Sequence, residues 1–289
     1  MNQKKVSVIL VNYNGLQDTI ECINSLNKST YSNFDIIVID NHSTEDSTIL
    51  ETYDRVIYKR LPDNYGFGVA NNIGAEYAVE KGADYLLLLN NDTVVDKFLI
   101  EKFVSHAKDH VIETGAMYYY NFPEELWYGG GTWSRAKGNF RHQHFTDNRE
   151  VSFATGCCLF IPRNCFLDIG LFDDKYFMYC EDADFSIKAL KHGYKLFYIC
   201  DAKLWHKVGK SIDKTIGLKD YYITRNRLYL MHKYKKEFGL TTYLYFGATR
   251  LVYIIRALLK GKDIAPIIDG IKDYRANHMG RKDYRNRLL

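Results

Sequence analysis

Apolar positions in the N-terminal third of the chain alternate between two spacings. Apolar runs at residues 6–11 and 85–89 predict buried strands, the run within 35–40 predicts another strand, and residues 56–59 predict a weaker one. Apolar residues at helical spacing predict helices over 16–26 and 69–77. Another helix is predicted from Ser43 to about Tyr53, because Ser43 and Asp46 resemble a capping box. This alternation indicates an α/β fold with a doubly wound, mainly parallel sheet.

The rest of the chain is less regular. Three glycines at 129–131 predict a flexible loop, and residues 152–161 and 196–199 predict strands. Glu181 begins a predicted helix that ends at Gly193, and the pattern is helical from Asp220 onward. We therefore predict a domain of residues 1–215 followed by a helical extension of residues 216–289.

Polar side chains follow three of the predicted strands. They are Asn12, Tyr13 and Asn14, then Asp40 and Asn41, then Asn90, Asn91 and Asp92. Asn and Asp are also common turn residues, so any one group has that alternative explanation. Parallel strands deliver their carboxyl ends to one edge, where ligands bind in such sheets. Three groups of polar side chains at the same edge of the sheet favour a binding site over three unrelated turns.

Asp92 ends a buried apolar strand, which would deliver its carboxylate into this edge. Mg²⁺ and Mn²⁺ prefer oxygen ligands and often bind one or two carboxylates together with diphosphate oxygens. The alternative is that Asp92 caps a helix over residues 94–107.

Glu181 and Asp182 would stand at the start of a helix, where the dipole favours a charged carboxylate. An ionised acid can act as a general base toward a hydroxyl group. The alternative is that the pair serves only the helix dipole. His206 follows another predicted strand and could ligate a metal, although a single histidine is more often a surface or core residue.

Gly66 and Gly68 begin a predicted helix in a GxGxx pattern. A dinucleotide site is rejected because Asn71 occupies the third glycine position and the segment does not follow the first strand. Glycines here can still let the backbone approach a ligand.

The net charge of +4 is unevenly distributed. Residues 250–289 contain ten Lys or Arg and four Asp beside apolar helical stretches. This suits an anionic membrane surface, while a plain solvated face and nucleic acid are the alternatives. The apolar stretch at 240–259 is interrupted by Gly247, Arg250 and Arg256, so a spanning helix is not expected. It could instead lie on a membrane, form a homodimer interface or pack on the first domain.

The six cysteines have no zinc spacing and mostly lie in apolar runs, which predicts buried free thiols in a reducing compartment. The chain begins almost directly with a strand, so no signal peptide is visible and a cytoplasmic location is expected. The 24 Tyr and 16 Phe suit a carbohydrate site, although core packing explains most of them.

Taken together, the chain resembles the GT-A glycosyltransferases of family 2, and among them bacterial rhamnosyltransferase-like enzymes. The resemblance covers roughly residues 5–235 and rests on the order of several short stretches. These stretches are 6–15, 39–44, 64–74, 88–93, 155–163, 172–185, 205–211 and 221–227.

The resemblance implies a GT-A domain with a nucleotide-sugar half at about 1–100 and an acceptor half at about 101–215. It implies a general base at Asp182, with Glu181 beside it, and metal ligands at Asp92 and His206. It also implies a set of residues that bind the nucleotide-sugar. That set is Asn12, Tyr13, Asn14, Asp40, Phe67, Gly68, Asn71, Asn90, Asn91 and Arg225.

One position departs from the family pattern. The metal-binding D-x-D motif usually carries two acids, and here its first place is Asn90. We therefore expect Mg²⁺ or Mn²⁺ to arrive with the donor diphosphate. Relatives with Asn in this place favour a dTDP-sugar such as dTDP-rhamnose, with a UDP-sugar as the other donor considered.

The expected reaction is inverting transfer of a sugar to a hydroxyl group of a cell-surface polysaccharide or lipid-linked glycan. The location would be cytoplasmic or peripheral on the inner face of the membrane, with no nucleic-acid partner. Two rival functions are a sugar-nucleotide nucleotidyltransferase and a non-catalytic protein that binds glycan or membrane. The first would need a basic Gly-rich loop after the first strand, where this chain has no Lys or Arg before Lys28.

Overall fold

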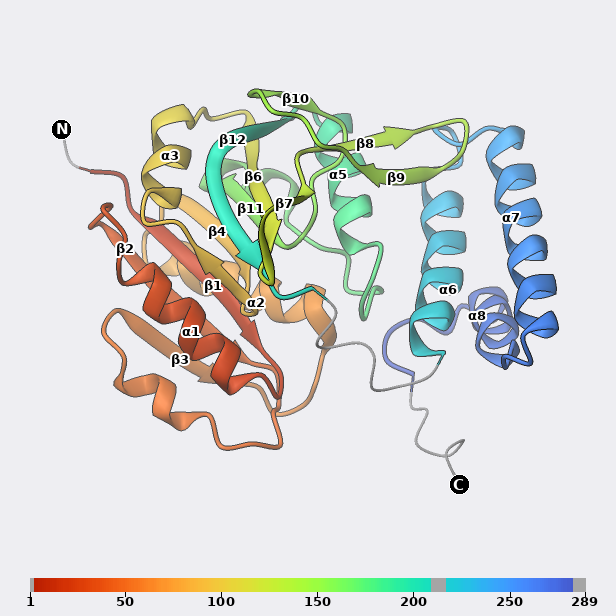
Figure 1. Cartoon of the computed structure of the whole chain (residues 1–289), viewed down its shortest axis with the longest axis horizontal. Helices are drawn as coiled ribbons and strands as arrows, with labels where there is room; N and C mark the ends of the chain where they lie inside the picture. The colour runs from red at the N-terminus through yellow and green to blue at the C-terminus, as the bar shows by residue number, and fades with distance from the viewer. Residues whose placement is uncertain (1–2, 209–216, 283–289) are drawn as a thin grey trace.

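The computed structural model describes residues 3–208 and 217–282. A twisted sheet of ten strands forms the larger part of the molecule, and three helices stand beyond one end of it (Figure 1). The predicted α/β class is confirmed. The predicted boundary near residue 215 lies outside the described residues.

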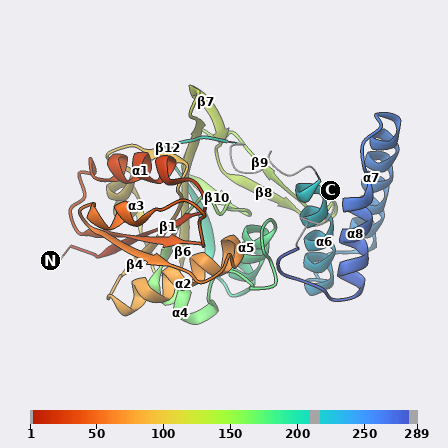
Figure 2. The ribbon, with the colours of Figure 1, turned by 90° about the horizontal axis from the view of Figure 1, so that it is seen from below.

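Four parallel strands form one half of the sheet, in the order β3-β2-β1-β4. They are β1 (Val6–Asn12), β2 (Phe34–Asp40), β3 (Val56–Arg60) and β4 (Tyr85–Asn90). The helices between them are α1 (Leu16–Leu26) and α2 (Gly66–Glu80). Figure 2 shows these helices on opposite faces of the sheet, as a doubly wound fold requires.

The segment after β2 differs from the prediction. Instead of a helix from Ser43, only a short 3₁₀ turn, η1 (Thr48–Thr52), forms. Ser43 does not cap a helix, because its hydroxyl oxygen already accepts hydrogen bonds from the Asn14 amide and the Asn12 carboxamide. These bonds hold the segment against the end of β1.

The second half of the sheet is mixed. Its order continues from β4 through β11 (Cys158–Pro162), β6 (Val111–Tyr119), β12 (Lys195–His206) and β10 (Arg149–Val151). Strand β11 is antiparallel to β4 and β6, while β12 runs parallel to β6. Two short strands attach at its edges, β5 (Thr93–Val95) to β12 and β7 (Phe122–Tyr128) to β6. Helices α3 (Leu99–His106), α4 (Arg163–Ile169) and α5 (Glu181–Lys191) connect these strands.

The three glycines predicted to form a flexible loop lie in closely packed strand contacts. Gly131 belongs to β8 (Gly131–Ser134), which pairs with β9 (Asn139–His142). A Cβ atom on Gly131 would lie 2.5 Å from the Phe153 carbonyl oxygen. The glycines are therefore required by close backbone approach, and the flexible-loop prediction is wrong.

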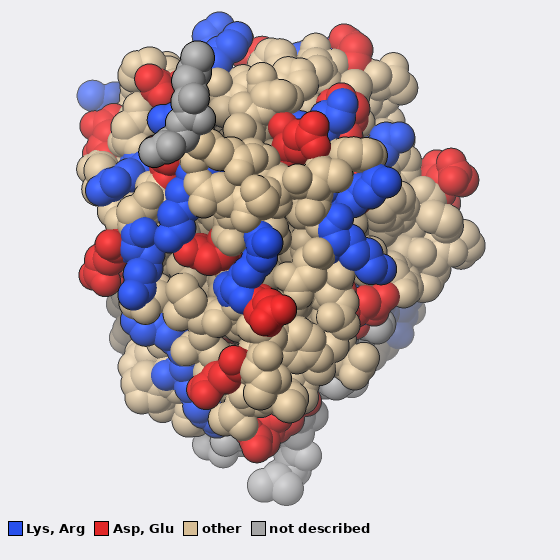
Figure 3. Space-filling view, turned by 90° about the vertical axis from the view of Figure 1, so that its left-hand side faces the viewer, with Lys and Arg blue, Asp and Glu red and all other residues tan. Residues whose placement is uncertain are grey.

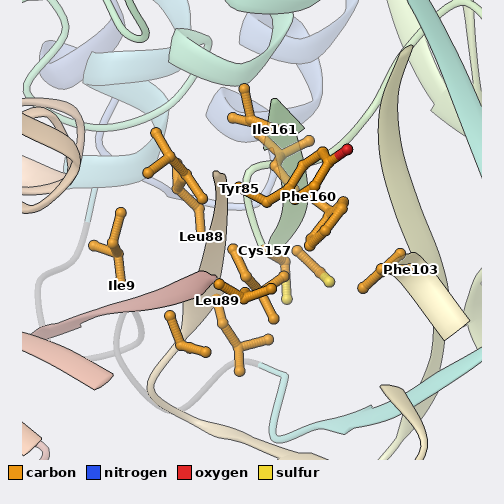
Figure 4. Close-up of a cluster of buried hydrophobic side chains, with 14 of the residues drawn as sticks. Ile9, Tyr85, Leu88, Leu89, Phe103, Cys157, Phe160 and Ile161 are labelled. Carbon is orange, nitrogen blue, oxygen red and sulfur yellow. The ribbon is translucent and has the colours of Figure 1, made fainter. Parts of the chain in front are cut away.

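The main core lies on both sides of β4 and β11. Figure 4 shows Phe103, Tyr85 and Ile161 gathered around Phe160. The Phe160 ring stacks on Tyr85 at 4.8 Å and on Phe103 at 5.1 Å between centroids. This packing fixes the position of the carboxyl end of β4, where Asn90 begins the polar segment.

The C-terminal helices are α6 (Leu218–Lys233), α7 (Leu240–Leu259) and α8 (Ala265–Arg275). A second core cluster joins α6 to the sheet side through Phe153, Ile187, Met231 and Phe238. Within the described ranges, no helix is both long and apolar enough to cross a membrane. Cys22, Cys157, Cys158 and Cys165 are buried, and all six cysteines are free thiols, as predicted.

Candidate active site

Strand pairing brings Asp92 and His206 together, although 114 residues separate them in the chain. Directly after Asp92, β5 lies antiparallel to the end of β12, with Thr93 opposite His206. The Lys207 amide donates to the Asp92 carbonyl at 2.9 Å and closes this pairing. As a result, His206 Nε2 lies 3.1 Å from Asp92 Oδ1.

The atoms around this pair have the composition of a cation site. The Asn90 carboxamide nitrogen lies 3.5 Å from His206 Nε2, and either end of a carboxamide can be turned to a neighbour. Asn90 Oδ1 and Asp92 Oδ1 are buried and accept no hydrogen bond within the described part of the chain, although His206 Nε2 lies 3.1 Å from Asp92 Oδ1. Buried oxygens without donors and an imidazole nitrogen suit Mg²⁺ or Mn²⁺.

The same atoms are too few for a complete cation site. Among residues 3–208 and 217–282, no group of three His, Cys, Asp or Glu side chains could hold a metal. The protein supplies one carboxylate, one amide and one imidazole, so a bound cation would need further oxygens from a ligand.

Asp182 is connected to residues 90–92 through two consecutive residues, Gly156 and Cys157. The Asn90 amide donates to the Cys157 carbonyl at 2.9 Å, and the preceding Gly156 amide donates to Asp182 Oδ2 at 3.2 Å. This geometry follows from the antiparallel register of β11 on β4, which places residues 155–157 beside the carboxyl end of β4. The structure therefore brings Asp92, His206 and Asp182 to one edge of the sheet.

The two adjacent acids have different environments. Glu181 is 8% exposed, and no donor in the described ranges reaches its Oε2. Burial, followed by the charge of Asp182, raises the pKa of Glu181 to about 8. Asp182 is more exposed and accepts from the Gly156 and Ala183 amides, at 3.2 and 2.8 Å. Burial also raises the pKa of Asp182, while these donors oppose that rise.

Helix α2 brings Phe67 close to Asp182, while the neighbouring Gly68 packs against Phe172. A Cβ atom on Gly156 would lie 3.2 Å from the Phe67 ring and 3.5 Å from the Asp182 Cβ, so the three residues meet. The preceding Gly66 has φ +84°, and its Cβ would lie 2.2 Å from the Phe177 carbonyl oxygen. Only glycine permits this approach, which fixes Phe67 in place.

Two of the residues assigned to donor binding are committed to internal bonds. Asn71 is 1% exposed and its carboxamide donates to the Phe67 carbonyl at 2.9 Å, which stabilises the first turn of α2. Asn91 donates to the Thr19 hydroxyl at 2.8 Å, so its side chain contacts α1. Donor contacts from these two side chains stay predictions.

Asn12 and Asp40 form a buried pair at the ends of β1 and β2. The Asn12 carboxamide donates to Asp40 Oδ2 at 2.8 Å, and Asp40 also accepts from the Ser47 hydroxyl and the Ser43 amide. Burial raises the pKa of Asp40, but these donors outweigh it and the net pKa is lowered. Both side chains are fully buried, so a contact with a nucleotide would need a rearrangement and stays a prediction.

Tyr13 and Asn14 are the accessible part of this segment. The Tyr13 ring is 47% exposed. Asn14 has φ +51°, and its side-chain oxygen accepts from the Thr44 amide at 2.7 Å. The two residues therefore form a fixed turn from which an aromatic ring projects at the carboxyl edge of the sheet.

Arg225 lies in the helical extension. Its guanidinium donates to the Tyr221 hydroxyl and to Asn226 Oδ1, each at 3.0 Å, and only 1% of the residue is exposed. It also lies over the Tyr222 ring at 5.0 Å. A contact of Arg225 with the donor stays a prediction, and it would need the guanidinium to leave these partners.

Two residues that do not belong to the predicted set of site residues lie beside His206. The Trp127 ring lies 4.8 Å from the His206 ring and forms one wall beside it. Lys207 is paired with Asp18 at 2.6 Å and with Glu21, and these pairs fasten the end of β12 to α1. The position of Lys207 next to His206 was a signal for Lys207, whereas Trp127 offered none. Residues 209–211, which end the family-like stretch 205–211, lie outside the described residues.

Two shallow hollows lie away from this edge. One, of about 190 Å³, is lined by polar side chains of the β8–β9 hairpin. The other, of about 280 Å³, lies beside Lys4 and Asp84 at the amino ends of β1 and β4. Neither contains a residue from the candidate active site.

The chain resembles proteins of a known family. Residues 7–170 match the family model described as glycosyl transferase family 2. The chain is 22% identical over 215 residues to the dTDP-rhamnosyl transferase RfbF of Shigella flexneri, which covers 68% of this chain and 71% of RfbF.

Two solved structures share the fold. A crystal structure of GalNAc-T7 with UDP, GalNAc and Mn²⁺ has a TM-score of 0.61 at 20% identity, over 71% of this chain and 44% of GalNAc-T7. The S. aureus TarS 1–349 complex with UDP-GlcNAc has a TM-score of 0.59 at 17% identity, over 93% of this chain and 80% of that one. The chain thus spans less than half of GalNAc-T7. The predicted GT-A fold is confirmed by these neighbours.

Proposed function

Because the chain belongs to glycosyl transferase family 2, we propose that it transfers a sugar from a nucleoside-diphosphate donor to a hydroxyl group of a cell-surface polysaccharide or lipid-linked glycan, with inversion at the anomeric carbon. The observation that carries this proposal is the convergence of Asp92, His206 and Asp182 at one edge of the sheet. A single displacement needs a base on one side of the sugar and charge stabilisation on the other.

Asp182 is the base in this proposal. It takes the proton from the acceptor hydroxyl, whose oxygen then attacks the anomeric carbon opposite the diphosphate. Glu181 supports it in the protonated form, since its raised pKa of about 8 leaves one negative charge on the acid pair at neutral pH. One charge can thus be held near Asp182, the more exposed acid, where the acceptor hydroxyl is reached.

The leaving-group side belongs to Asn90, Asp92 and His206. These residues would hold Mg²⁺ or Mn²⁺, a cation that neutralises charge developing on a departing diphosphate. This assignment is supported by the buried Asn90 Oδ1, which accepts no hydrogen bond in the described ranges, and by the 3.1 Å distance between His206 Nε2 and Asp92 Oδ1. Because the protein supplies a single carboxylate, from Asp92, we expect the cation and the donor to bind together.

The donor pocket in this proposal extends from the Tyr13–Asn14 turn to Phe67. Tyr13 would contact the nucleobase of the donor. Phe67 and Gly68 would border the donor sugar, with Phe67 next to Asp182. A dTDP-sugar, with rhamnose as the transferred sugar, is supported by the similarity to a dTDP-rhamnosyl transferase. A UDP-sugar is the other donor, since TarS has been solved with UDP-GlcNAc.

A panel of nucleotide-sugars tests the proposal. The measurements are the melting temperature with each compound and the release of nucleoside diphosphate, with and without EDTA. We expect one donor to raise the melting temperature in a metal-dependent way and to be hydrolysed slowly. Release of pyrophosphate from a nucleoside triphosphate would indicate a nucleotidyltransferase instead. A chain that binds glycan but hydrolyses no donor would be a non-catalytic binding protein.

The proposed place of action is the cytoplasmic face of the cell membrane, where a lipid-linked acceptor would be available. Dimerisation through the C-terminal helices is the competing use of their exposed apolar surface. The charges around that surface distinguish these two uses.

A further inference from the structure

Helix α7 presents an apolar face that nothing in the described part of the chain covers. Its exposed apolar side chains are between 46% and 83% accessible. At about 100° per residue they fall within one third of the helix circumference. We call this set the α7 stripe: Leu240, Leu244, Leu251, Val252, Ile255, Leu258 and Leu259.

The opposite side of α7 fixes the direction of the stripe. Thr242, Phe246 and Ala257 are buried there. The Tyr253 hydroxyl donates to Asp220 Oδ2 at 2.8 Å, and the Thr242 hydroxyl donates to the Arg135 carbonyl at 2.6 Å. Since these contacts hold the inner side against α6 and the β8–β9 hairpin, the stripe must face outward. Figures 1 and 2 both show α7 as an outer element at the end of the molecule away from the sheet.

One border of the stripe is basic. Helix α7 contains no Asp or Glu. By helical spacing, Arg256 lies along this border, and Lys260 and Lys262 follow the helix. Arg250 instead lies on the inner side, over the Phe246 and Tyr253 rings. Residues 240–282 contain eight basic and three acidic residues. In contrast, Figure 3 shows acidic and basic side chains interspersed on the far side of the molecule.

This charge pattern decides between the two occupants. A second copy packed on the stripe would bring two basic borders together with no acid on either helix to pair with them. An anionic lipid surface accepts apolar side chains below its headgroups and attracts basic side chains at the headgroup level.

We propose that the α7 stripe docks this chain on an anionic membrane surface. Leu244, Leu251 and Ile255 insert below the headgroups, and Arg256, Lys260 and Lys262 lie against the lipid phosphates. A lipid-linked acceptor would then be presented at the surface that holds the enzyme. That last step rests on the proposed function, whereas docking itself is measured without any sugar.

The test is co-sedimentation of the full chain with two kinds of vesicle. One contains only phosphatidylcholine, and the other contains equal parts of phosphatidylcholine and phosphatidylglycerol. We expect binding to the anionic vesicles only, and weaker binding as salt is raised. Leu251→Glu with Ile255→Glu should lower the partition coefficient by about tenfold or more. Arg256→Glu with Lys260→Glu should also lower it, without touching the apolar side chains.

Leu167→Glu on α4 is the matched control, because Leu167 is 61% exposed and lies away from α7. It should bind anionic vesicles like the unchanged chain. Circular dichroism and donor hydrolysis should be unchanged in every variant, since none of these residues belongs to the active site. A failure of donor hydrolysis in the unchanged chain would count against the proposed function and leave docking intact.

Three results would overturn docking. One is no sedimentation of the unchanged chain with anionic vesicles at low salt. Another is a folded double variant, either Leu251→Glu with Ile255→Glu or Arg256→Glu with Lys260→Glu, that binds anionic vesicles as strongly as the unchanged chain. The third is a dimer in solution that the Leu251→Glu, Ile255→Glu variant converts to a monomer, which would make the stripe an interface between two copies.

Discussion

The Asn226 carboxamide donates to the Tyr179 carbonyl at 2.9 Å, and also to the Met178 carbonyl at 2.8 Å. Tyr179 and Cys180 both have left-handed backbone, with φ of +69° and +72°. Such a conformation is costly for residues other than glycine and needs support from outside the segment. Since Glu181 follows directly, Asn226 on α6 holds the turn that presents the acid pair.

Asn226→Ala should therefore reduce turnover more than donor binding. Without the bonds from Asn226, two half-buried carbonyls lose their donor and the turn before Asp182 can relax. We expect a fall of roughly 1–3 kcal/mol in the free energy of unfolding and a lower kcat with little change in the donor Kd. Denaturant titration, steady-state kinetics and calorimetry measure these quantities. Asn33→Ala, which removes one exposed hydrogen bond, is the control. An unchanged kcat in Asn226→Ala would show that the bonds from Asn226 do not position the base.

Asp182→Asn should abolish transfer and preserve donor binding. Loss of a general base lowers the rate by about 10² to 10⁴, while the amide keeps the size of the side chain. Glu181→Gln is the matched control, because burial and the charge of Asp182 raise the pKa of Glu181, and the amide resembles the protonated acid. Transfer rates and donor Kd measured at pH 7 distinguish the two acids. Equal losses in both variants would contradict the separate roles proposed for them.

The metal assignment predicts changes in opposite directions at two neighbouring positions. Asp92→Ala removes the single carboxylate and should weaken Mn²⁺-dependent nucleotide binding. Asn90→Asp adds a second carboxylate and should raise Mn²⁺ affinity without nucleotide by about tenfold, the effect of 1.4 kcal/mol. Calorimetry with Mn²⁺ alone, and then with nucleotide, measures both. Asp109→Ala, on an exposed loop, should change neither. Unchanged affinities in both Asp92→Ala and Asn90→Asp would place the cation elsewhere.

Glu113 predicts a pH dependence of stability that is separate from catalysis. It lies in β6 and is 1% exposed, and burial raises its pKa from 4.5 to about 8. The folded state thus keeps a proton that the unfolded chain releases near pH 4.5. This stabilisation is complete below pH 4.5 and is lost as the pH rises through 8.

Glu113→Gln should therefore gain stability relative to the unchanged chain between pH 4.5 and 9. The free energy of unfolding of Glu113→Gln, measured relative to that of the unchanged chain, should rise by on the order of 3 kcal/mol over this pH range. Chemical denaturation at pH 5, 7 and 9 measures it. Glu150→Gln, at an exposed ion pair with Lys195, should show no such trend. A constant difference between Glu113→Gln and the unchanged chain would show that Glu113 is ionised in the folded state.

The sequence predicted the backbone frame of the site well. Apolar runs located β1, β2 and β4, because a strand buried on both faces has to be apolar along its whole length, whereas β3 is only half-buried and its run is weaker. Such runs also indicated where the polar residues begin, so Asn90 and Asp92 could be placed at the carboxyl edge. The same pattern gave a short strand at 196–199, whereas β12 continues to His206, since its second half carries polar residues on one side.

The direction of individual side chains could not be predicted in this way. Asn91 stands between Asn90 and Asp92 but contacts α1, because successive residues at a strand end point to different sides. Arg225 and Asn226 are adjacent on α6, yet Arg225 is held by Tyr221 while Asn226 holds the Tyr179 turn. Which neighbour meets each side chain depends on helix packing between distant segments.

The sequence by itself determined strands β1 to β4, the helices α1 and α2 between them and the positions of Asp92 and Asp182 at the ends of elements, because hydrophobic spacing and strand ends are local properties. Only the tertiary structure decided that β5 pairs with β12 and brings His206 to Asp92, that Asp40 is enclosed by hydrogen bonds, and that α7 leaves one apolar side uncovered. The physical reason is that these outcomes depend on which surfaces meet across long stretches of chain, and a local pattern contains no information about its distant partner.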